Sequence, residues 1–252
     1  MPPLPRPAAT APAAVTAPPA GLGGPSPAEA RGLPPVCEGC RRWARQPVCA
    51  DCVAHHAAVA PRCGGCGMRL AAGAGARCGE CLRDPLPFDH VHCAVDYGFP
   101  WDALIGAFKY GGRAELAGAL AARLLAVLPP EAAAWPELVV PVPLARDRLA
   151  ARGYDQAWEL ARRVARAIDC PADATAIARA DGRSPQAGLD RAARRRNLRG
   201  AFAVPAPARV AGRRIALVDD VLTTGATAAE AAQALHAAGA AAVGVWAVAR
   251  TP

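Results

Sequence analysis

The last third of the chain alternates between short apolar runs and helix-forming runs. Residues 215–218 form an uncharged apolar run, which is typical of a strand buried in a parallel sheet. Residues 228–238 are mostly alanine and precede Gly239, so a helix is predicted to stop there. Residues 137–142 predict another strand, and residues 154–168 predict an amphipathic helix. The expected core face of that helix carries Trp158, Ala161, Val164, Ala165 and Ile168. Together these elements predict an α/β fold, a parallel sheet flanked by helices.

Three other segments lack this pattern. Residues 1–35 are mostly Pro, Ala and Gly, so we expect a disordered tail that buries too little surface to fold. Residues 180–199 are rich in Gly, Ser, Pro and Arg, which is typical of a mobile loop. Residues 36–92 hold most of the cysteines. The 252 residues are therefore predicted to divide into the tail, a cysteine-rich module at 36–92 and an α/β domain at 93–252.

Eight of the 10 cysteines form four Cys-x-x-Cys pairs. This spacing lets both sulfurs of a tight turn reach one ion, and two such turns complete a tetrahedral thiolate site. We therefore expect two structural zinc ions in a small zinc ribbon module, each held by four cysteines, with no open position for catalysis. The expected ligands are Cys37, Cys40, Cys49, Cys52, Cys63, Cys66, Cys78 and Cys81.

Two pairings of these turns are open. A sequential arrangement joins the first pair to the second and the third to the fourth, and the intervening loops are short enough for it. A cross-braced arrangement joins the first pair to the third. We favour the sequential arrangement. Cys93 and Cys170 have no partner at metal spacing, so we expect small core or half-buried residues there.

The formal net charge is +8, and Lys109 is the only lysine. A basic surface favours phosphate-bearing partners, either nucleic acid or small phosphorylated molecules. Several arginines of the cysteine module are compatible with single-stranded DNA: Arg41, Arg42, Arg45, Arg62 and Arg69. Aromatic residues make up only 5% of the chain, so platforms for stacking bases are scarce.

Apolar runs and the first 35 residues indicate where in the cell the protein is expected. No apolar run is long enough to span a membrane, and the first 35 residues do not resemble a secretory signal. We therefore expect a cytoplasmic protein, in a reducing compartment where regularly spaced cysteines bind metal.

The candidate binding site follows the run at 215–218. Asp219 and Asp220 are predicted to follow the strand, and a Thr/Gly loop leads into the next helix. The amides of residues 224–227 can converge on one phosphate at the positive end of that helix, with Gly225 allowing close approach. The residues expected to hold the phosphate are Thr223, Thr224, Gly225, Ala226 and Thr227.

The acidic pair needs a different ligand, because carboxylates repel phosphate. It suits the hydroxyls of a sugar or a hydrated Mg²⁺ near them. The site is therefore predicted to take a sugar with a 5′-phosphate. A Gly-x-x-x-x-Gly-Lys P-loop is absent, which disfavours a nucleoside-triphosphate hydrolase.

Residues 218–227, Val-Asp-Asp-Val-Leu-Thr-Thr-Gly-Ala-Thr, closely resemble the signature of the type I phosphoribosyltransferases, which bind phosphoribosyl pyrophosphate. Other segments resemble the ComF family, whose members join an amino-terminal zinc ribbon region to a phosphoribosyltransferase-like domain. The resemblance covers residues 36–250. The segments that carry it are 108–112, 139–144, 152–156, 182–186 and 194–202.

The resemblance implies further site residues. A basic loop with Arg146, Arg148 and Arg152 is expected to hold pyrophosphate, and Arg152 and Gly153 are the best candidates. Many relatives have Asn where this chain has Asp155, which either removes an amide contact or caps the helix.

Two further contributions are expected. A flexible hood is expected to close and exclude water, which would bring in Gln186, Arg194 and Asn197. Lys109 is either a compact ammonium for the pyrophosphate or a surface lysine at a helix end.

The function implied by the resemblance is binding of phosphoribosyl pyrophosphate with Mg²⁺ and transfer of the phosphoribosyl group to an unnamed acceptor. ComF relatives are linked to DNA uptake in natural competence, so competence proteins are expected partners. Asp219 and Asp220 would orient the ribose hydroxyls, and Mg²⁺ with Arg152 would neutralise the leaving group. Two alternatives are a factor that binds single-stranded DNA without turnover and senses ligand at this site, and a nucleobase salvage enzyme, which the cysteine module disfavours.

Overall fold

Four parallel strands form the central sheet. The computed structural model describes residues 36–129, 135–179 and 200–252, so the predicted tail and the loop at 180–199 lie outside the described residues. The strand order is β1-β6-β5-β2, and each neighbouring pair is parallel. A separate antiparallel pair joins β3 to β4. The strands are β1 (His90–Asp96), β2 (Leu138–Pro141), β3 (Ala178–Arg179), β4 (Phe202–Ala203), β5 (Arg214–Leu222) and β6 (Ala242–Arg250).

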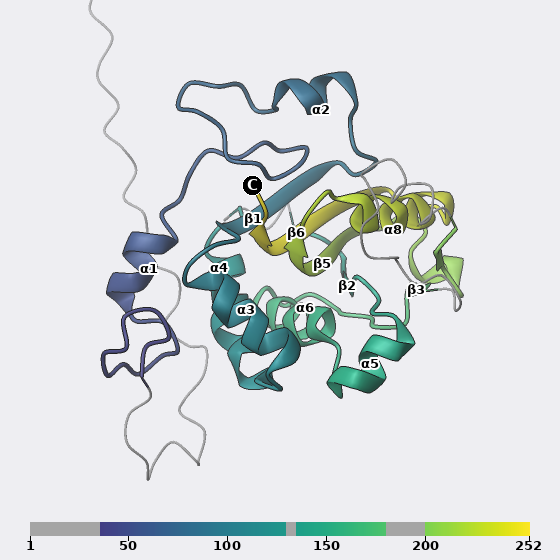
Figure 1. The fold of residues 1–252 in the computed structure, drawn as a ribbon. Helices are drawn as coiled ribbons and strands as arrows, with labels where there is room; N and C mark the ends of the chain where they lie inside the picture. The colour runs from purple at the N-terminus through teal and green to yellow at the C-terminus, as the bar shows by residue number, and fades with distance from the viewer. Residues whose placement is uncertain (1–35, 130–134, 180–199) are drawn as a thin grey trace, which may run out of the picture. The chain divides into compact units, whose positions relative to one another are not determined.

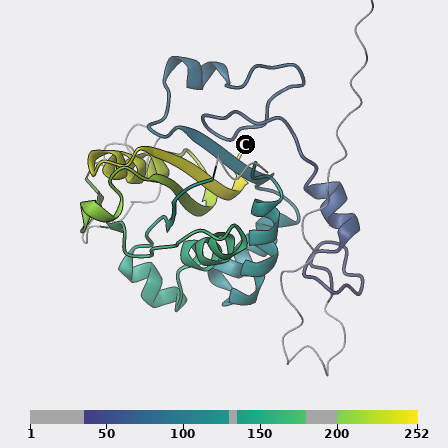
Figure 2. The same cartoon turned by 180° about the vertical axis from the view of Figure 1, so that it is seen from behind.

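Helices cover both faces of this sheet (Figures 1 and 2). One face carries α8 (Ala226–Ala237), and the other carries α3 (Trp101–Tyr110), α4 (Ala117–Leu125) and α6 (Gln156–Ala167). Short 3-10 turns cover Ala114–Leu116 and Pro207–Arg209. The expected α/β fold is confirmed. Within the described residues, no helix is both long enough and apolar enough to cross a membrane.

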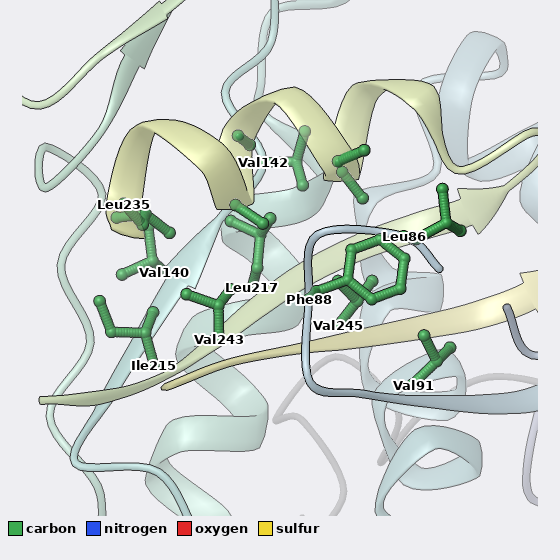
Figure 3. Packing of buried hydrophobic residues seen from close by; sticks show 14 of the residues in the cluster. Leu86, Phe88, Val91, Val140, Val142, Ile215, Leu217, Leu235, Val243 and Val245 are labelled. Atoms are coloured by element: carbon green, nitrogen blue, oxygen red, sulfur yellow. The ribbon is translucent and has the colours of Figure 1, made fainter. Parts of the chain in front are cut away.

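Alternate side chains of β5 pack into two separate hydrophobic cores, one on each face of the sheet. Ile215 and Leu217 join the core beneath α8, part of which Figure 3 shows. Ala216 and Val218 join the core beneath α3, α4 and α6. Both faces are therefore apolar, which explains why this strand is a continuous apolar run in the sequence.

The helix boundaries differ slightly from the predictions. Helix α6 begins at Gln156, because the Asp155 carboxylate accepts the Trp158 amide at 3.0 Å as an N-cap. Helix α8 begins two residues earlier than predicted, directly after Gly225. The predicted stop is confirmed, since Gly239 follows α8 with a φ of 93°.

The basic segment after β2 was wrongly predicted to be a loop. Residues Arg146–Arg152 form a helix, α5, none of whose residues is buried. Its run of Arg, Leu and Ala consists of good helix formers, and Gly153 ends it with a φ of 79°. The arginines therefore lie on a short surface helix.

The cysteine module consists of two small units, which we call the first ribbon (residues 36–57) and the second ribbon (residues 61–83). Each contains an antiparallel bridge, Val36 to Trp43 or Arg62 to Arg69. Each ends in a short helix, α1 (Ala50–His56) or α2 (Gly79–Arg83). The second ribbon lies along the outer edge of β1, where the Val91 amide donates to the Gly64 carbonyl at 3.0 Å. The predicted domain boundary at residue 92 falls inside β1.

Candidate functional site

The eight paired cysteines form two clusters in the sequential arrangement. Within each cluster the four sulfur atoms lie within 4.8 Å of one another. The cross-braced alternative is therefore excluded. The clusters are Cys37, Cys40, Cys49 and Cys52 in the first ribbon, and Cys63, Cys66, Cys78 and Cys81 in the second.

The sulfur spacing fits a zinc ion. The sulfurs of Cys40 and Cys49 are 3.7 Å apart, and so are those of Cys66 and Cys78. A zinc–sulfur distance of about 2.3 Å in a tetrahedron places the sulfurs about 3.8 Å apart. The donor set and its spacing therefore suit one tetrahedral ion in each ribbon.

The clusters also favour thiolates at selected positions. The Arg42 guanidinium donates to the Cys40 sulfur at 3.4 Å and lowers the pKa of that thiol to about 6. Burial opposes ionisation of Cys63, yet the amides of Cys78 and Gly65 lower its pKa to about 6. Burial raises the pKa of Cys81, so four thiolates can coexist only around a cation.

The acidic pair lies within β5, not after it as predicted. Strand β6 continues alongside and pairs Leu222 with Arg250, so the ladder extends past both acids. Strand β2 stops at Pro141 opposite Val218. Beyond Val218, β5 therefore pairs with β6 but not with β2, and both acids lie in this stretch.

The two acids have different surroundings. Asp220 is buried and lies on the α3/α6 face, where the Lys109 ammonium is 2.8 Å from its Oδ1. Strand alternation places Asp219 on the α8 face. Burial, then the charge of Asp220, raises the pKa of Asp219 to about 8. Lys109 is thus mostly buried and paired with an acid. It is therefore not the surface lysine that one of the two interpretations expected.

A third acid adjoins this pair. Burial raises the pKa of Asp155 against the lowering effect of amide hydrogen bonds, and the charge of Asp220 raises it further. Asp155 caps α6, as one of the two interpretations expected. Next to it, Gln156 is 2% exposed, and its Nε2 has no hydrogen-bond partner among the described residues. Sequence reasoning placed neither residue in the site, although both belong to the Arg-Gly-Tyr-Asp-Gln segment.

The phosphate loop (residues 223–227) follows β5 and includes the first two residues of α8. Gly225 has a φ of 76°, and a Cβ there would lie 3.2 Å from Cδ1 of Leu86. The left-handed backbone therefore favours glycine, and an added Cβ would press on Leu86 in the segment that follows the second ribbon, where Figure 3 shows Leu86 and Phe88. The Ala226 amide donates to Thr224 Oγ1 at 3.3 Å. Thr223 is exposed, and Thr224 and Thr227 are half-buried.

Arg152 lies beside the end of α3. Its Nη1 donates to Gln156 Oε1 at 2.7 Å, and its guanidinium lies 4.8 Å from the centre of the Tyr110 ring. Tyr110 directly follows Lys109. The structure thus brings together residues of α3, α5 and α6 near the acidic pair. The predicted hood residues Gln186, Arg194 and Asn197 lie outside the described residues.

Comparisons with known proteins agree with this arrangement. Residues 155–252 match the model of the phosphoribosyl transferase domain. The DNA utilization protein YhgH of Escherichia coli K12 is 35% identical over 229 residues, which cover 87% of this chain and 98% of that protein. Competence protein F of Haemophilus influenzae is 34% identical over 220 residues, covering 85% of this chain and 95% of that protein. The chain therefore belongs to the ComF family and carries a phosphoribosyltransferase-like domain behind two four-cysteine ribbons.

Proposed function

We propose that the chain binds phosphoribosyl pyrophosphate together with Mg²⁺ and transfers its phosphoribosyl group. The observation that carries this proposal is the junction of β5 and α8, where two acids precede a left-handed Gly225 and the start of a twelve-residue helix. Amides at such a start favour a phosphate. The acids beside them suit a neutral sugar, so one sugar phosphate satisfies both parts.

Different residues of the chain are proposed to bind different parts of the ligand. The amides and hydroxyls of the phosphate loop hold the 5′-phosphate. Asp219 orients the ribose hydroxyls, and Lys109 fixes the second acid, Asp220, beside it. The carboxylates of Asp219 and Asp155 are the hard oxygen donors that suit Mg²⁺. When bound, Mg²⁺ neutralises charge on the departing pyrophosphate.

Pyrophosphate also needs a cation from the protein. Arg152 is the proposed one, because it is half-exposed and contacts Tyr110 and Gln156, which are the chain neighbours of Lys109 and Asp155. Gly153 next to it leaves space above the backbone, since a Cβ there would meet nothing within 4 Å. The hood residues Gln186, Arg194 and Asn197 are proposed to join on closure.

Calorimetry with phosphoribosyl pyrophosphate tests the proposal. We expect Mg²⁺-dependent heat of binding, and an affinity loss of about 100-fold in Asp219→Ala/Asp220→Ala, because two hydrogen-bonding carboxyl groups are removed. The control Asp102→Ala/Glu230→Ala removes the same number of carboxyl groups, from α3 and α8, and should bind normally. Absence of binding heat with and without Mg²⁺ would refute the proposal.

A second candidate function is binding of single-stranded DNA without turnover. The relatives' names refer to DNA utilization and to competence, which supports a role in handling DNA. The supporting surface is on the first ribbon, where Trp43 is 62% exposed beside the exposed Arg41 and Arg45. An exposed indole among arginines suits a stacked base. Salt-sensitive DNA binding that survives Asp219→Ala/Asp220→Ala but not Trp43→Ala would favour this function.

A further inference from the structure

Arg250, the last residue of β6, connects the second ribbon to the start of the phosphate loop. Its Nε donates to the Cys66 carbonyl at 2.7 Å. Its Nη1 donates to the Leu222 carbonyl at 3.3 Å. Leu222 is the last residue of β5 and directly precedes the phosphate loop. One guanidinium therefore touches a cysteine of the second cluster and the strand end from which the loop departs.

A second contact reaches the middle of the same loop. Leu86 lies a few residues after Cys81, and its Cδ1 would be 3.2 Å from a Cβ on Gly225. Leu86 and Phe88, both labelled in Figure 3, belong to the same core as α8. Three cysteines of the second cluster, Cys63, Cys66 and Cys81, belong to that core too. The second ribbon therefore contacts the start of the loop through Arg250, and the segment that follows the ribbon places Leu86 next to Gly225.

The first ribbon has different neighbours. The Trp101 indole in α3 donates to the His56 carbonyl at 2.7 Å, and Arg113 forms an ion pair with Glu38. Cys37 and Cys52 belong to the core beneath α3, α4 and α6. The contacts of this ribbon therefore go to the opposite face of the sheet from the phosphate loop.

We propose that the second four-cysteine cluster positions the phosphate loop through Arg250, so that metal in this cluster, and not in the first, strengthens binding of a sugar 5′-phosphate. The ligand is the one in the proposed function, on which this inference rests. Arg250 is a positioning residue, because it contacts carbonyl oxygens and not the phosphate. Metal fixes the turn that carries the Cys66 carbonyl, so a loop held by that turn loses less freedom when ligand binds.

Arg250→Met in the full zinc-loaded chain tests the link. We expect affinity for phosphoribosyl pyrophosphate with Mg²⁺ to fall about tenfold, within the usual range for coupled sites. We also expect faster amide hydrogen exchange at residues 223–227 without ligand, while zinc content stays unchanged. Arg250→Lys should resemble Arg250→Met, because one ammonium does not reproduce the fork that spans two carbonyls.

Arg69→Met is the matched control. Arg69 also ties the second ribbon to the sheet, through an ion pair with Asp96 at 2.7 Å, but its contact lies at the end of β1. This variant should keep both the affinity and the exchange rates of the loop. Loop exchange that is equal in Arg250→Met and the parent chain would overturn the proposal, and so would an equal response to Arg69→Met.

The role of the metal is tested by Cys66→Ser against Cys49→Ser, each of which should lose one zinc ion. Only Cys66→Ser should speed exchange at residues 223–227, and equal responses would overturn the proposal. If Cys66→Ser does not fold, stepwise chelation of the parent chain, followed by exchange in both ribbons and the loop, gives the same comparison. Because exchange needs no ligand, a chain that shows this pattern but binds no phosphoribosyl pyrophosphate would contradict the proposed function and leave the coupling intact.

Discussion

The two ribbons share a design but contact opposite faces of the sheet. Both use two Cys-x-x-Cys turns, an antiparallel bridge and a short helix. The first packs against the face of α3, which carries Lys109, whereas the second packs against the face of α8, which follows the phosphate loop. Metal held by the two clusters would therefore support opposite faces of the sheet.

Their arginines differ in a similar way. In the second ribbon, Arg62 and Arg69 both form ion pairs with Asp96 at 2.7 Å, and the Arg62 side chain is only 11% exposed. These two residues hold the ribbon to β1. In the first ribbon, Arg41 and Arg45 are exposed near Trp43. Any contact of the ribbons with nucleic acid is therefore expected at the first ribbon.

The largest expected effect comes from breaking both clusters together. Cys37→Ser/Cys63→Ser removes one ligand from each ribbon and should lose both zinc ions, whereas Cys37→Ser/Cys49→Ser should lose one. Each structural zinc contributes on the order of 10 kcal/mol of metal-binding free energy. The variant with two broken clusters should therefore melt at the lower temperature. Metal analysis and thermal melts check this, and loss of a single ion from Cys37→Ser/Cys63→Ser would indicate cross-braced ligands.

Lys109→Met tests the α3 face alone. It leaves Asp220 buried without its cation, so we expect the free energy of unfolding to fall by about 3 kcal/mol. The double variant Lys109→Met/Asp220→Leu should recover most of this loss, because no unpaired charge remains. Urea unfolding of both variants measures the difference. If Lys109→Met is as stable as the parent chain, the buried ion pair does not stabilise this face.

Asp219→Asn tests the other face through pH. The pKa of Asp219 is raised to about 8, above the ordinary carboxyl value of about 4, so the folded chain retains a proton that the unfolded chain loses. Stability should fall as pH rises through this window. The stability of Asp219→Asn relative to the parent chain should therefore increase from pH 4 to pH 8. In thermal melts, each 1 kcal/mol gained should raise the melting temperature by about 2–4 °C.

The control for this prediction has the opposite sign. Burial opposes ionisation of Asp173, but hydrogen bonds from Thr175 and the charge of Arg209 lower its pKa. Its ionised form stabilises the fold above the ordinary carboxyl pKa, and that contribution disappears as pH falls through the lowered value. Asp173→Asn should therefore cost stability at neutral pH and little in acid. A trend of the same sign in both variants would show that one of the two pKa assignments is wrong.

The smallest expected effect concerns docking of the first ribbon. Trp101→Phe removes the indole donor to the His56 carbonyl and should cost about 1 kcal/mol more than Trp246→Phe. Trp246 is equally buried, but its Nε1 has no partner among the described residues. Both variants lose the same ring volume, so the difference between their free energies of unfolding in denaturant measures the contribution of that hydrogen bond. Equal losses would mean that this bond adds nothing to docking.

Local signals predicted much of this molecule. The apolar run of β5, the stop at Gly239 and the cap at Asp155 depend on neighbouring residues, and the structure confirms them. The sequential cysteine clusters follow from short spacing in the same way. These features could be predicted because each is determined within a few residues along the chain.

Features set by distant partners were missed. Strand β5 extends past its acids because β6, a different segment, continues beside it. The pairing of Lys109 with Asp220 depends on how α3 packs on the sheet, which no local pattern encodes. Helix α5 was missed for another reason: its arginines and aspartate resemble a solvated loop, but its Arg, Leu and Ala residues favour a helix.

The position of the second ribbon along β1 has one more consequence. Strand β1 is at the end of the sheet order and pairs with β6 on one side only. On its other side the Val91 amide is taken by Gly64, and Gly67 lies so close that a Cβ there would be 2.5 Å from the Cys93 sulfur. Unpaired sheet edges recruit strands from other molecules. The second ribbon covers this edge, so we expect loss of metal from its four cysteines to expose the edge and to promote aggregation.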